Sequence, residues 1–140
     1  MDALTGEMVF ANQILVTADA PGTAVTAYNG NQSIVADSYQ GGFRLRESGR
    51  GNGIRTFDMN QGTNYGSAVD FTDGDNFWNN VNAQLDQYAG DAHFGSEATY
   101  DYYFLEHGRN SIDGNGFTLN TYMHYDQNFV NAFWDGQRMT

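Results

Sequence analysis

Between positions 81 and 107, one set of residues recurs three, four or seven apart, which is the spacing of one face of an α-helix. The set is Val81, Leu85, Tyr88, Ala92, Thr99, Tyr103 and His107. Gly90 and Gly95 weaken the middle of this stretch, so the spacing also fits a helix that begins near Asp86. Gly108 follows the stretch and is suited to end it. The sequence therefore predicts one long helix, and the other elements have to pack around it.

The other apolar runs are short and are separated by glycine, a pattern typical of strands joined by tight turns. The chain has 17 Gly and a single Pro. Strands are predicted over residues 24–28, 33–36, 43–46, 54–58 and 117–125. The segment Asp-Gly-Asn-Gly at residues 113–116 predicts a hairpin turn before the last strand. One helix with many strands predicts an α+β fold.

The two ends of the strand region are less regular. Residues 1–16 have the pattern of a hairpin, and residues 17–22, which contain the only Pro, predict a linker. Residues 59–80 form a long polar stretch, and the acidic turn at residues 73–76 is the feature expected to hold it in place. The N-terminus lacks the basic and apolar regions of a signal peptide, so the protein is either cytoplasmic or a piece of a longer chain.

The charge balance excludes some classes of partner. The chain has 17 Asp and Glu against 6 basic residues, which gives a net charge of -11. Such a surface argues against nucleic acid and anionic membranes as partners, and it fits a secreted protein that binds calcium. No Cys is present and no apolar run approaches the length of a membrane span.

Two groups of residues could hold metal ions. Asp73 and Asp75, with the backbone carbonyl of Phe77, offer the oxygen ligands that calcium prefers, although their spacing alone favours a solvated acidic turn. His93 and Glu97 lie four apart on the predicted helix, which suggests zinc, but His107 is too far along the helix to join them. Histidines that serve the structure are the favoured interpretation, and no HExxH motif occurs in the sequence.

The segment Asn-Ala-Phe-Trp at residues 131–134 follows the last predicted strand. If that strand is the exposed edge of a sheet, its free backbone groups can pair with an extended peptide, and these four residues would form the wall of the groove. Two adjacent aromatic residues can equally belong to the core. The residues alone leave these two interpretations nearly even, and they contain no convincing catalytic site.

From Arg50 onward the sequence resembles the N-terminal domain of thermolysin-like zinc metalloproteases, the family of thermolysin and bacillolysin. The resemblance rests on the order and spacing of Arg-Gly-Asn-Gly-Ile-Arg-Thr-Phe-Asp at 50–58, Asp-Gly-Asp-Asn at 73–76, Asp-Ala-His at 91–93, Thr-Tyr-Asp-Tyr-Tyr at 99–103, Ser-Ile-Asp-Gly-Asn at 111–115, His-Tyr at 124–125 and Asn-Ala-Phe-Trp at 131–134.

The resemblance implies a twisted antiparallel sheet packed on one long helix, and it divides the chain in two. Residues 1–20 would be the end of a propeptide, with the maturation cleavage in the 17–22 linker, and residues 21–140 would be the substrate-edge domain. It also favours a calcium site at Asp73, Asp75 and Phe77 over the interpretation of this segment as a solvated acidic turn.

Asn131, Ala132, Phe133 and Trp134 match a segment that binds substrate in the family. There, the Asn side chain and the Ala backbone hold the peptide main chain, and the two aromatic side chains line the subsites. The resemblance thus implies a secreted zinc metalloendopeptidase whose substrate is a peptide or protein. The family's HExxH motif, its third zinc ligand and its transition-state-stabilising His all lie beyond this chain. We therefore expect the chain to need its missing catalytic domain as a partner and to be inactive alone. The alternative is a non-catalytic extracellular module that binds calcium or peptides.

Overall fold

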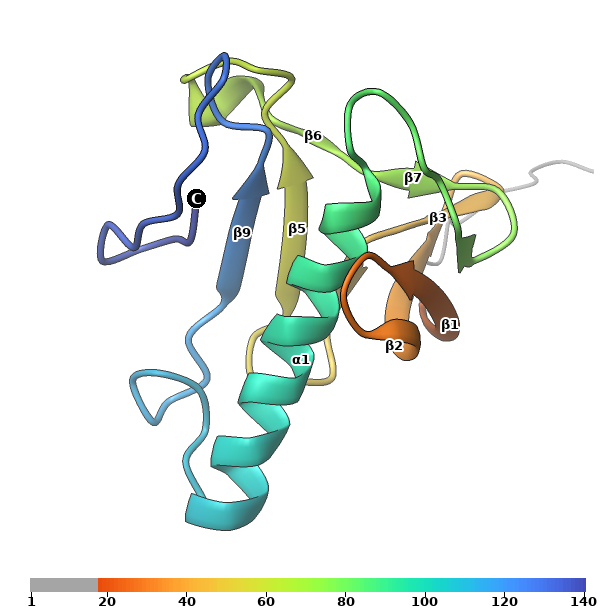
Figure 1. Ribbon diagram of the computed structural model, residues 1–140. Helices are drawn as coiled ribbons and strands as arrows, with labels where there is room; N and C mark the ends of the chain where they lie inside the picture. Colours follow the sequence, from red (N-terminus) through yellow and green to blue (C-terminus); the bar gives the residue numbers. More distant parts are fainter. Residues whose placement is uncertain (1–17) are drawn as a thin grey trace, which may run out of the picture.

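The computed structural model describes residues 18–140, in which two β-sheets pack against one long helix (Figure 1). The elements are β1 (Asp19–Thr26), β2 (Gly30–Tyr39), β3 (Gly42–Arg44), β4 (Arg46–Glu47), β5 (Ile54–Asp58), the 3₁₀ turn η1 (Tyr65–Ser67), β6 (Val69–Asp70), β7 (Thr72–Asp73), β8 (Phe77–Trp78), α1 (Gln87–His107) and β9 (Leu119–Met123). The α+β fold predicted from the sequence is confirmed.

The larger sheet has the strand order β7-β3-β2-β1-β8. Its centre is the antiparallel hairpin of β1 and β2, which pair from Asp19 opposite Asp37 to Thr26 opposite Gly30. Side chains on one face of this hairpin meet α1, and the buried core there consists of Ala24, Ile34, Ala36, Leu45, Phe71, Trp78 and Ala89. The small residues of β1 and β2 let the helix approach the sheet closely.

The predicted linker at residues 17–22 is wrong over most of its length, because Asp19 to Gly22 form the first half of β1. Pro21 is tolerated in the strand, and it pairs with Val35 of β2. The boundary between residues 20 and 21 therefore falls inside a strand, while the hairpin predicted for residues 1–16 lies outside the described residues. The division of the chain into propeptide and domain stays a prediction.

The smaller sheet has the order β4-β5-β6, and β9 pairs with β5 in parallel, from Ile54 opposite Leu119 to Asp58 opposite Met123. β8 also pairs in parallel, with β1. The sheets are therefore mixed, where the family resemblance implied an antiparallel sheet. The residues at 113–116 do form a turn, but it joins α1 to β9, so the predicted hairpin is wrong. Turn residues specify the local bend, whereas the type of the preceding element depends on how the chain packs.

Helix α1 begins at Gln87 with Asp86 as its capping residue, and it ends at His107. The later of the two predicted starts is thus confirmed. Gly108 takes the left-handed conformation, with φ 61°, and its N–H donates to the carbonyl of Phe104. In Figure 1 the C-terminal turns of α1 project beyond both sheets. No helix in the described residues has the length and apolarity needed to cross a membrane.

The polar stretch at residues 59–80 is held in place by Asn76. The side chain of Asn76 accepts a hydrogen bond from the indole N–H of Trp78 (2.9 Å) and donates one to the carbonyl of Pro21 (3.1 Å). Its backbone carbonyl accepts the N–H of Thr23 (3.1 Å). A Cβ at Gly22 would come within 2.3 Å of the Asn76 side chain, so glycine is needed at this contact. The acidic turn is therefore fixed to β1, as the sequence predicted.

Candidate functional site

The outer edge of β9 is covered by the end of the chain. The N–H of Met139 donates to the carbonyl of Asn120 (3.0 Å), and the N–H of Tyr122 donates to the carbonyl of Met139 (2.9 Å). In Figure 1 the C-terminus accordingly lies beside β9. The prediction that this strand forms the exposed edge is wrong, because the chain turns back and pairs with it. The exposed edge lies farther out.

Residues 133–140 form a terminal hairpin that provides this outer edge. The N–H of Phe133 donates to the carbonyl of Thr140 (2.9 Å), and the N–H of Thr140 donates to the carbonyl of Phe133 (3.0 Å). Trp134 bridges to Met139 in the antiparallel sense. In such a ladder, residues that do not exchange hydrogen bonds point their N–H and C=O the other way. The backbone of Trp134 therefore faces outward from the sheet.

The hairpin turn is stabilised by Asp135. Its Oδ1 accepts the N–H groups of Gln137 (2.8 Å) and Arg138 (2.9 Å), and its Oδ2 lies 3.0 Å from the Arg138 Nε. These backbone N–H groups hold the pKa of Asp135 below its usual value. The turn fixes the distance between the two arms of the hairpin, and hence the place of the outer edge.

The structure brings together the four residues predicted to hold a peptide. Asn131 and Ala132 are exposed, Phe133 is half-buried and Trp134 is 44% exposed. The Oδ1 of Asn131 accepts the N–H of Ala132 (2.9 Å), which leaves the amide nitrogen of Asn131 available to another acceptor. Phe133 and Trp134 are successive residues of an extended segment, so their side chains lie on opposite faces.

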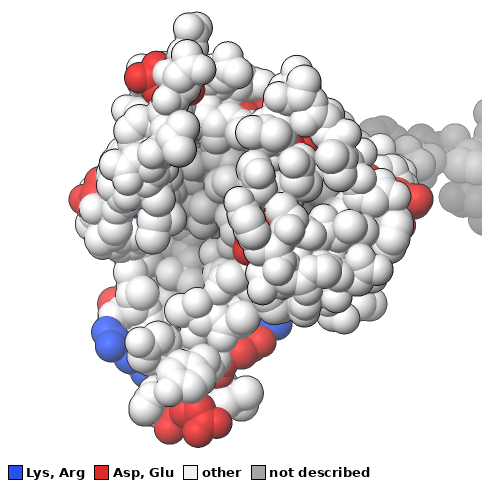
Figure 2. Space-filling view, viewed as in Figure 1, with Lys and Arg blue, Asp and Glu red and all other residues white. Residues whose placement is uncertain are grey.

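An apolar groove of about 620 Å³ lies on the Trp134 face, between α1 and β9. It is lined by Ala92, Gly95, Ser96, Thr99, Ile112, Leu119, Asn120, Thr121, Trp134 and Met139. Figure 2 shows the corresponding hollow left of centre, and most of the atoms that surround it are uncharged. Trp134 also contacts the ring of Phe117, 6.2 Å away between centroids. The candidate edge and the groove therefore form one continuous surface.

The predicted calcium residues lie in a different part of the fold, at the turn between β7 and β8. The Oδ1 of Asp73 accepts the N–H of Asp75 (2.9 Å), and the Oδ1 of Asp75 accepts the N–H of Phe77 (3.0 Å). Each carboxylate thus uses one oxygen to shape the turn and keeps the other. The geometry is compatible with an acidic turn and with a calcium-binding turn.

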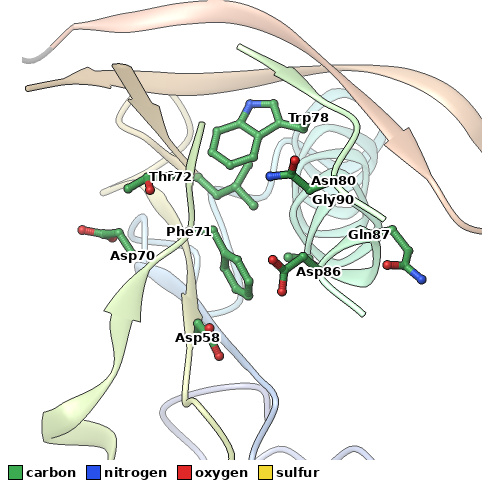
Figure 3. Close-up of a pocket in the computed structure, with 11 residues that line it drawn as sticks. Asp58, Asp70, Phe71, Thr72, Trp78, Asn80, Asp86, Gln87 and Gly90 are labelled. Atoms are coloured by element: carbon green, nitrogen blue, oxygen red, sulfur yellow. The ribbon is translucent and has the colours of Figure 1, made fainter. Parts of the chain in front are cut away.

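A second cavity, of about 190 Å³, opens at the N-terminal end of α1 (Figure 3). Its carboxylates do not converge, since in Figure 3 the Phe71 ring lies among Asp58, Asp70 and Asp86. Asp70 pairs instead with Arg46, at 2.6 Å. Asp86 and Asp58 are likewise engaged, with Asn82 and His124 respectively. This cavity therefore lacks the free ligands that a cation needs.

The three histidines lie apart. His93 is fully buried, with Nδ1 2.9 Å from the Thr56 hydroxyl and Nε2 2.9 Å from the Val35 carbonyl. His107 is at the exposed end of α1, and His124 pairs with Asp58 at 3.0 Å. The interpretation of His93 as a residue that serves the structure is consistent with these contacts, because both of its ring nitrogens are engaged.

Glu97 lies beside His93 in a buried ionic cluster. Its Oε1 accepts the N–H of Val35 (2.9 Å) and lies 3.2 Å from Arg50 Nη1. Burial raises the pKa of Glu97 to about 7, against the opposing effects of the Val35 N–H and Arg50. Burial likewise lowers the pKa of His93 to about 4. This cluster joins α1 to β2 and to the loop after β4.

No group of three or more His, Asp or Glu residues in the described part of the chain is arranged to hold a metal ion. The described residues therefore do not fit a catalytic zinc, and we derive no chemical step through one. The calcium pair at Asp73 and Asp75 has only two carboxylates, so this observation does not test it.

Sequence reasoning missed the residues that give the edge its shape. Arg138 to Thr140 provide the strand between β9 and Trp134, and Tyr125 and Phe129 pack against Phe133. The aromatic residues at 125, 129 and 133 recur every fourth position, and this regularity could have identified them. It would have suggested a helix, whereas the segment is irregular.

The sequence profile described as "Thermolysin metallopeptidase, catalytic domain" matches residues 21–140. The chain therefore matches the thermolysin metallopeptidase profile over most of its length. The location of the zinc ligands in another part of the whole protein stays a prediction.

Individual proteins match over the same region. The transglutaminase-activating metalloprotease of Streptomyces mobaraensis is 36% identical over 135 residues, which cover 96% of this chain and 17% of that protein. Bacillolysin of Brevibacillus brevis is 34% identical over 140 residues, which cover 99% of this chain and 25% of that protein. The chain thus spans a quarter or less of the length of these relatives.

Among solved structures, the precursor of protealysin, a metalloproteinase from Serratia proteamaculans, is 30% identical to the chain. The match covers 61% of this chain and 25% of that one, with a TM-score of 0.47.

Proposed function

The chain belongs to the thermolysin metallopeptidase family, and we propose that it supplies the edge on which a secreted zinc metalloendopeptidase holds an extended peptide. The observation that carries this proposal is the outward-facing backbone of Trp134 at the free edge of the terminal hairpin. A peptide that pairs with such an edge gains main-chain hydrogen bonds, and nearby side chains select among sequences.

Asn131 and Trp134 are the side chains best placed for that selection. Both are exposed, and the amide nitrogen of Asn131 is available to donate a hydrogen bond to a carbonyl of the peptide. Trp134 offers a broad apolar surface at the mouth of the groove. We propose that these two residues, with the backbone of Ala132, contact the peptide.

The apolar groove beside Trp134 is suited to packing against another part of the protein. It is wide, uncharged and continuous with the exposed apolar side chains of Ile112 and Met139. An exposed apolar surface of this kind marks a site of packing in soluble proteins. We propose that the rest of the enzyme packs here in the whole protein. The catalytic zinc would then be held by residues outside these 140, since the described residues do not fit it.

Peptide binding at the edge can be followed through tryptophan fluorescence. Trp78 is buried and Trp134 is exposed, so a bound peptide should shift mainly the emission of Trp134. With a capped hexapeptide of alternating leucine and serine as the probe, we expect binding without cleavage, even with zinc added. Asn131→Ala should weaken the affinity about tenfold, the cost of one hydrogen bond.

Asn115→Ala is the matched control, because Asn115 is an exposed asparagine in the turn at residues 113–116. It should leave the affinity unchanged. Equal affinities for the two variants would contradict the assignment of the edge. Cleavage of the probe by the 140-residue chain would contradict the proposed location of the zinc ligands.

We also propose that calcium stabilises the turn at Asp73 and Asp75. Each carboxylate retains one oxygen beyond those that shape the turn, and the backbone carbonyl of Phe77 is close in sequence. Saturating calcium should raise the melting temperature by about 5–10 °C, and Asp73→Ala should abolish this rise. Differential scanning calorimetry with calcium or with a chelator measures both.

Asp113→Ala provides the control for calcium. The Oδ1 of Asp113 also accepts backbone N–H groups in an Asp-Gly turn, from Asn115 (2.8 Å) and Phe117 (3.0 Å). This variant should lower the melting temperature with or without calcium and keep the calcium-dependent rise. If calcium leaves the melting temperature of the unsubstituted chain unchanged, the proposed site is wrong.

A further inference from the structure

We infer that three aromatic side chains, Tyr125, Phe129 and Phe133, form a positioning device that fixes the peptide-binding edge. We call this set the aromatic triangle. The inference rests on the proposed function, and it concerns the residues that hold the edge in place.

The aromatic triangle is a closed set of ring contacts. The ring centroids of Tyr125 and Phe129 lie 5.4 Å apart, those of Tyr125 and Phe133 5.8 Å, and those of Phe129 and Phe133 6.0 Å. All three contacts are edge-to-face, the geometry that aromatic pairs prefer. Each ring therefore restrains the other two.

Tyr65 joins the triangle to the smaller sheet and to the terminal hairpin. Its ring stacks on Tyr125 at 5.7 Å and meets Tyr122 of β9 at 4.9 Å. Its hydroxyl is 2.9 Å from the hydroxyl of Thr140, and the Arg138 guanidinium lies 4.3 Å above its ring. Through Tyr65, the triangle therefore contacts both β9 and the terminal hairpin.

The backbone between β9 and the edge has little other support. Its last backbone contact with the body of the described structure is the N–H of Asp126, which donates to Gly62 (3.0 Å), and the next is at Phe133. Within the connection, His124, Asp126 and Asn128 take the left-handed conformation, with φ of 55°, 55° and 57°. Asn, Asp and His adopt this conformation more readily than other non-glycine residues, and each marks a bend in the connection. Packing of the triangle is the restraint available to residues 127–132.

The triangle also assigns different roles to the two adjacent aromatic residues. Phe133 is half-buried, its backbone pairs with Thr140 and its ring belongs to the triangle. Trp134, on the opposite face, borders the groove. Phe133 therefore helps to position the edge through its ring. Its role in contacting the peptide, together with Asn131 and Trp134, stays a prediction.

The test removes one corner of the triangle that is not part of the edge. Phe129→Ala should weaken binding of the capped leucine–serine hexapeptide about tenfold or more. It should also speed amide exchange at Phe133 and Thr140, whose N–H groups join the two arms of the hairpin. The amide of Tyr122, which donates to Met139 in the sheet, should keep its protection. Phe129→Tyr restores a ring at this position, so it should recover both affinity and protection.

Phe104→Ala is the matched control. Phe104 is 48% exposed and stacks on Tyr100 near the far end of α1, so the same truncation there leaves the edge untouched. Equal affinity and equal amide exchange in the Phe129→Ala and Phe104→Ala variants would overturn the inference. Faster exchange at Tyr122 as well would also overturn it, because the effect would then be a general loss of stability.

The two proposals can fail separately. If the unsubstituted chain does not bind the hexapeptide, the proposed function fails. Amide exchange at Phe133 and Thr140 still reports on positioning in that case, since it needs no peptide. Faster exchange in Phe129→Ala alone supports the triangle, and unchanged exchange refutes it.

Discussion

Replacing Arg50 with Met is expected to lower the free energy of unfolding by about 3–5 kcal/mol. The guanidinium lies 3.2 Å from Glu97, makes two hydrogen bonds of 2.8 Å to Asp101, and is 3.8 Å from Glu47. Glu47 and Glu97 are buried, so removal of Arg50 leaves two carboxyl groups without their counterion. Breaking a buried ion pair on one side costs far more than the pair itself contributes. Urea unfolding followed by circular dichroism measures the change.

Arg55→Met is the control for this prediction. Arg55 is an exposed residue of the neighbouring strand β5, opposite Arg46, and makes no ion pair within residues 18–140. Its replacement should change the free energy of unfolding by about 0.5 kcal/mol or less. If both arginine variants unfolded at the same urea concentration, the buried cluster would not be a major source of stability.

The second large effect concerns pH, and it arises from the opposite pKa shifts of Glu97 and His93. Glu97 has a pKa of about 7 in the folded chain against an ordinary value of 4.5. Between these values the folded state binds more protons than the unfolded state, so the contribution of Glu97 to stability falls as pH rises. It is fully present below pH 4.5 and is lost above about pH 7.

His93 acts in the opposite direction. Its pKa is about 4 in the folded chain against an ordinary value of 6.5, because the charged form is excluded from the core. Between these values the unfolded state binds more protons, so the contribution of His93 rises with pH and is fully present above pH 6.5. The two contributions overlap and partly cancel in the unsubstituted chain.

Single substitutions separate the two contributions. The stability difference between the unsubstituted chain and Glu97→Gln should decrease as pH rises from 4.5 to 7. The difference from His93→Gln should increase as pH rises from 4 to 6.5. Either slope can reach about 1.4 kcal/mol per pH unit, the limit for one proton. Urea unfolding at a series of pH values tests this, and a flat difference for either variant would contradict the pKa assigned to that residue.

Much of the fold follows from local sequence. The helix Gln87–His107 was predictable in extent, since its start near Asp86 and its terminal glycine agree with the sequence. Its buried face was not, because the helix buries Ala89, Gly90, His93, Glu97 and Tyr100 and leaves Thr99, Tyr103 and His107 exposed. The strand at residues 54–58 was predicted with its observed bounds, since its alternation is undisturbed. In contrast, Asp19 to Gly22 look like a linker in sequence and become a strand through pairing with β2. A partner strand supplies the hydrogen bonds that local composition does not reveal.

The candidate site shows the same division. The sequence, through its resemblance to the thermolysin family, identified Asn131, Ala132, Phe133 and Trp134 as one candidate unit after the last strand, and the family itself is confirmed. Only the tertiary structure decided which segment has backbone groups free to pair with a peptide. Met139 takes the edge of β9, the hairpin moves the free edge to Trp134, and the aromatic triangle holds it there. These contacts join residues whose order in the chain carries no sign of their pairing, because pairing depends on where the turns bring the strands together in space.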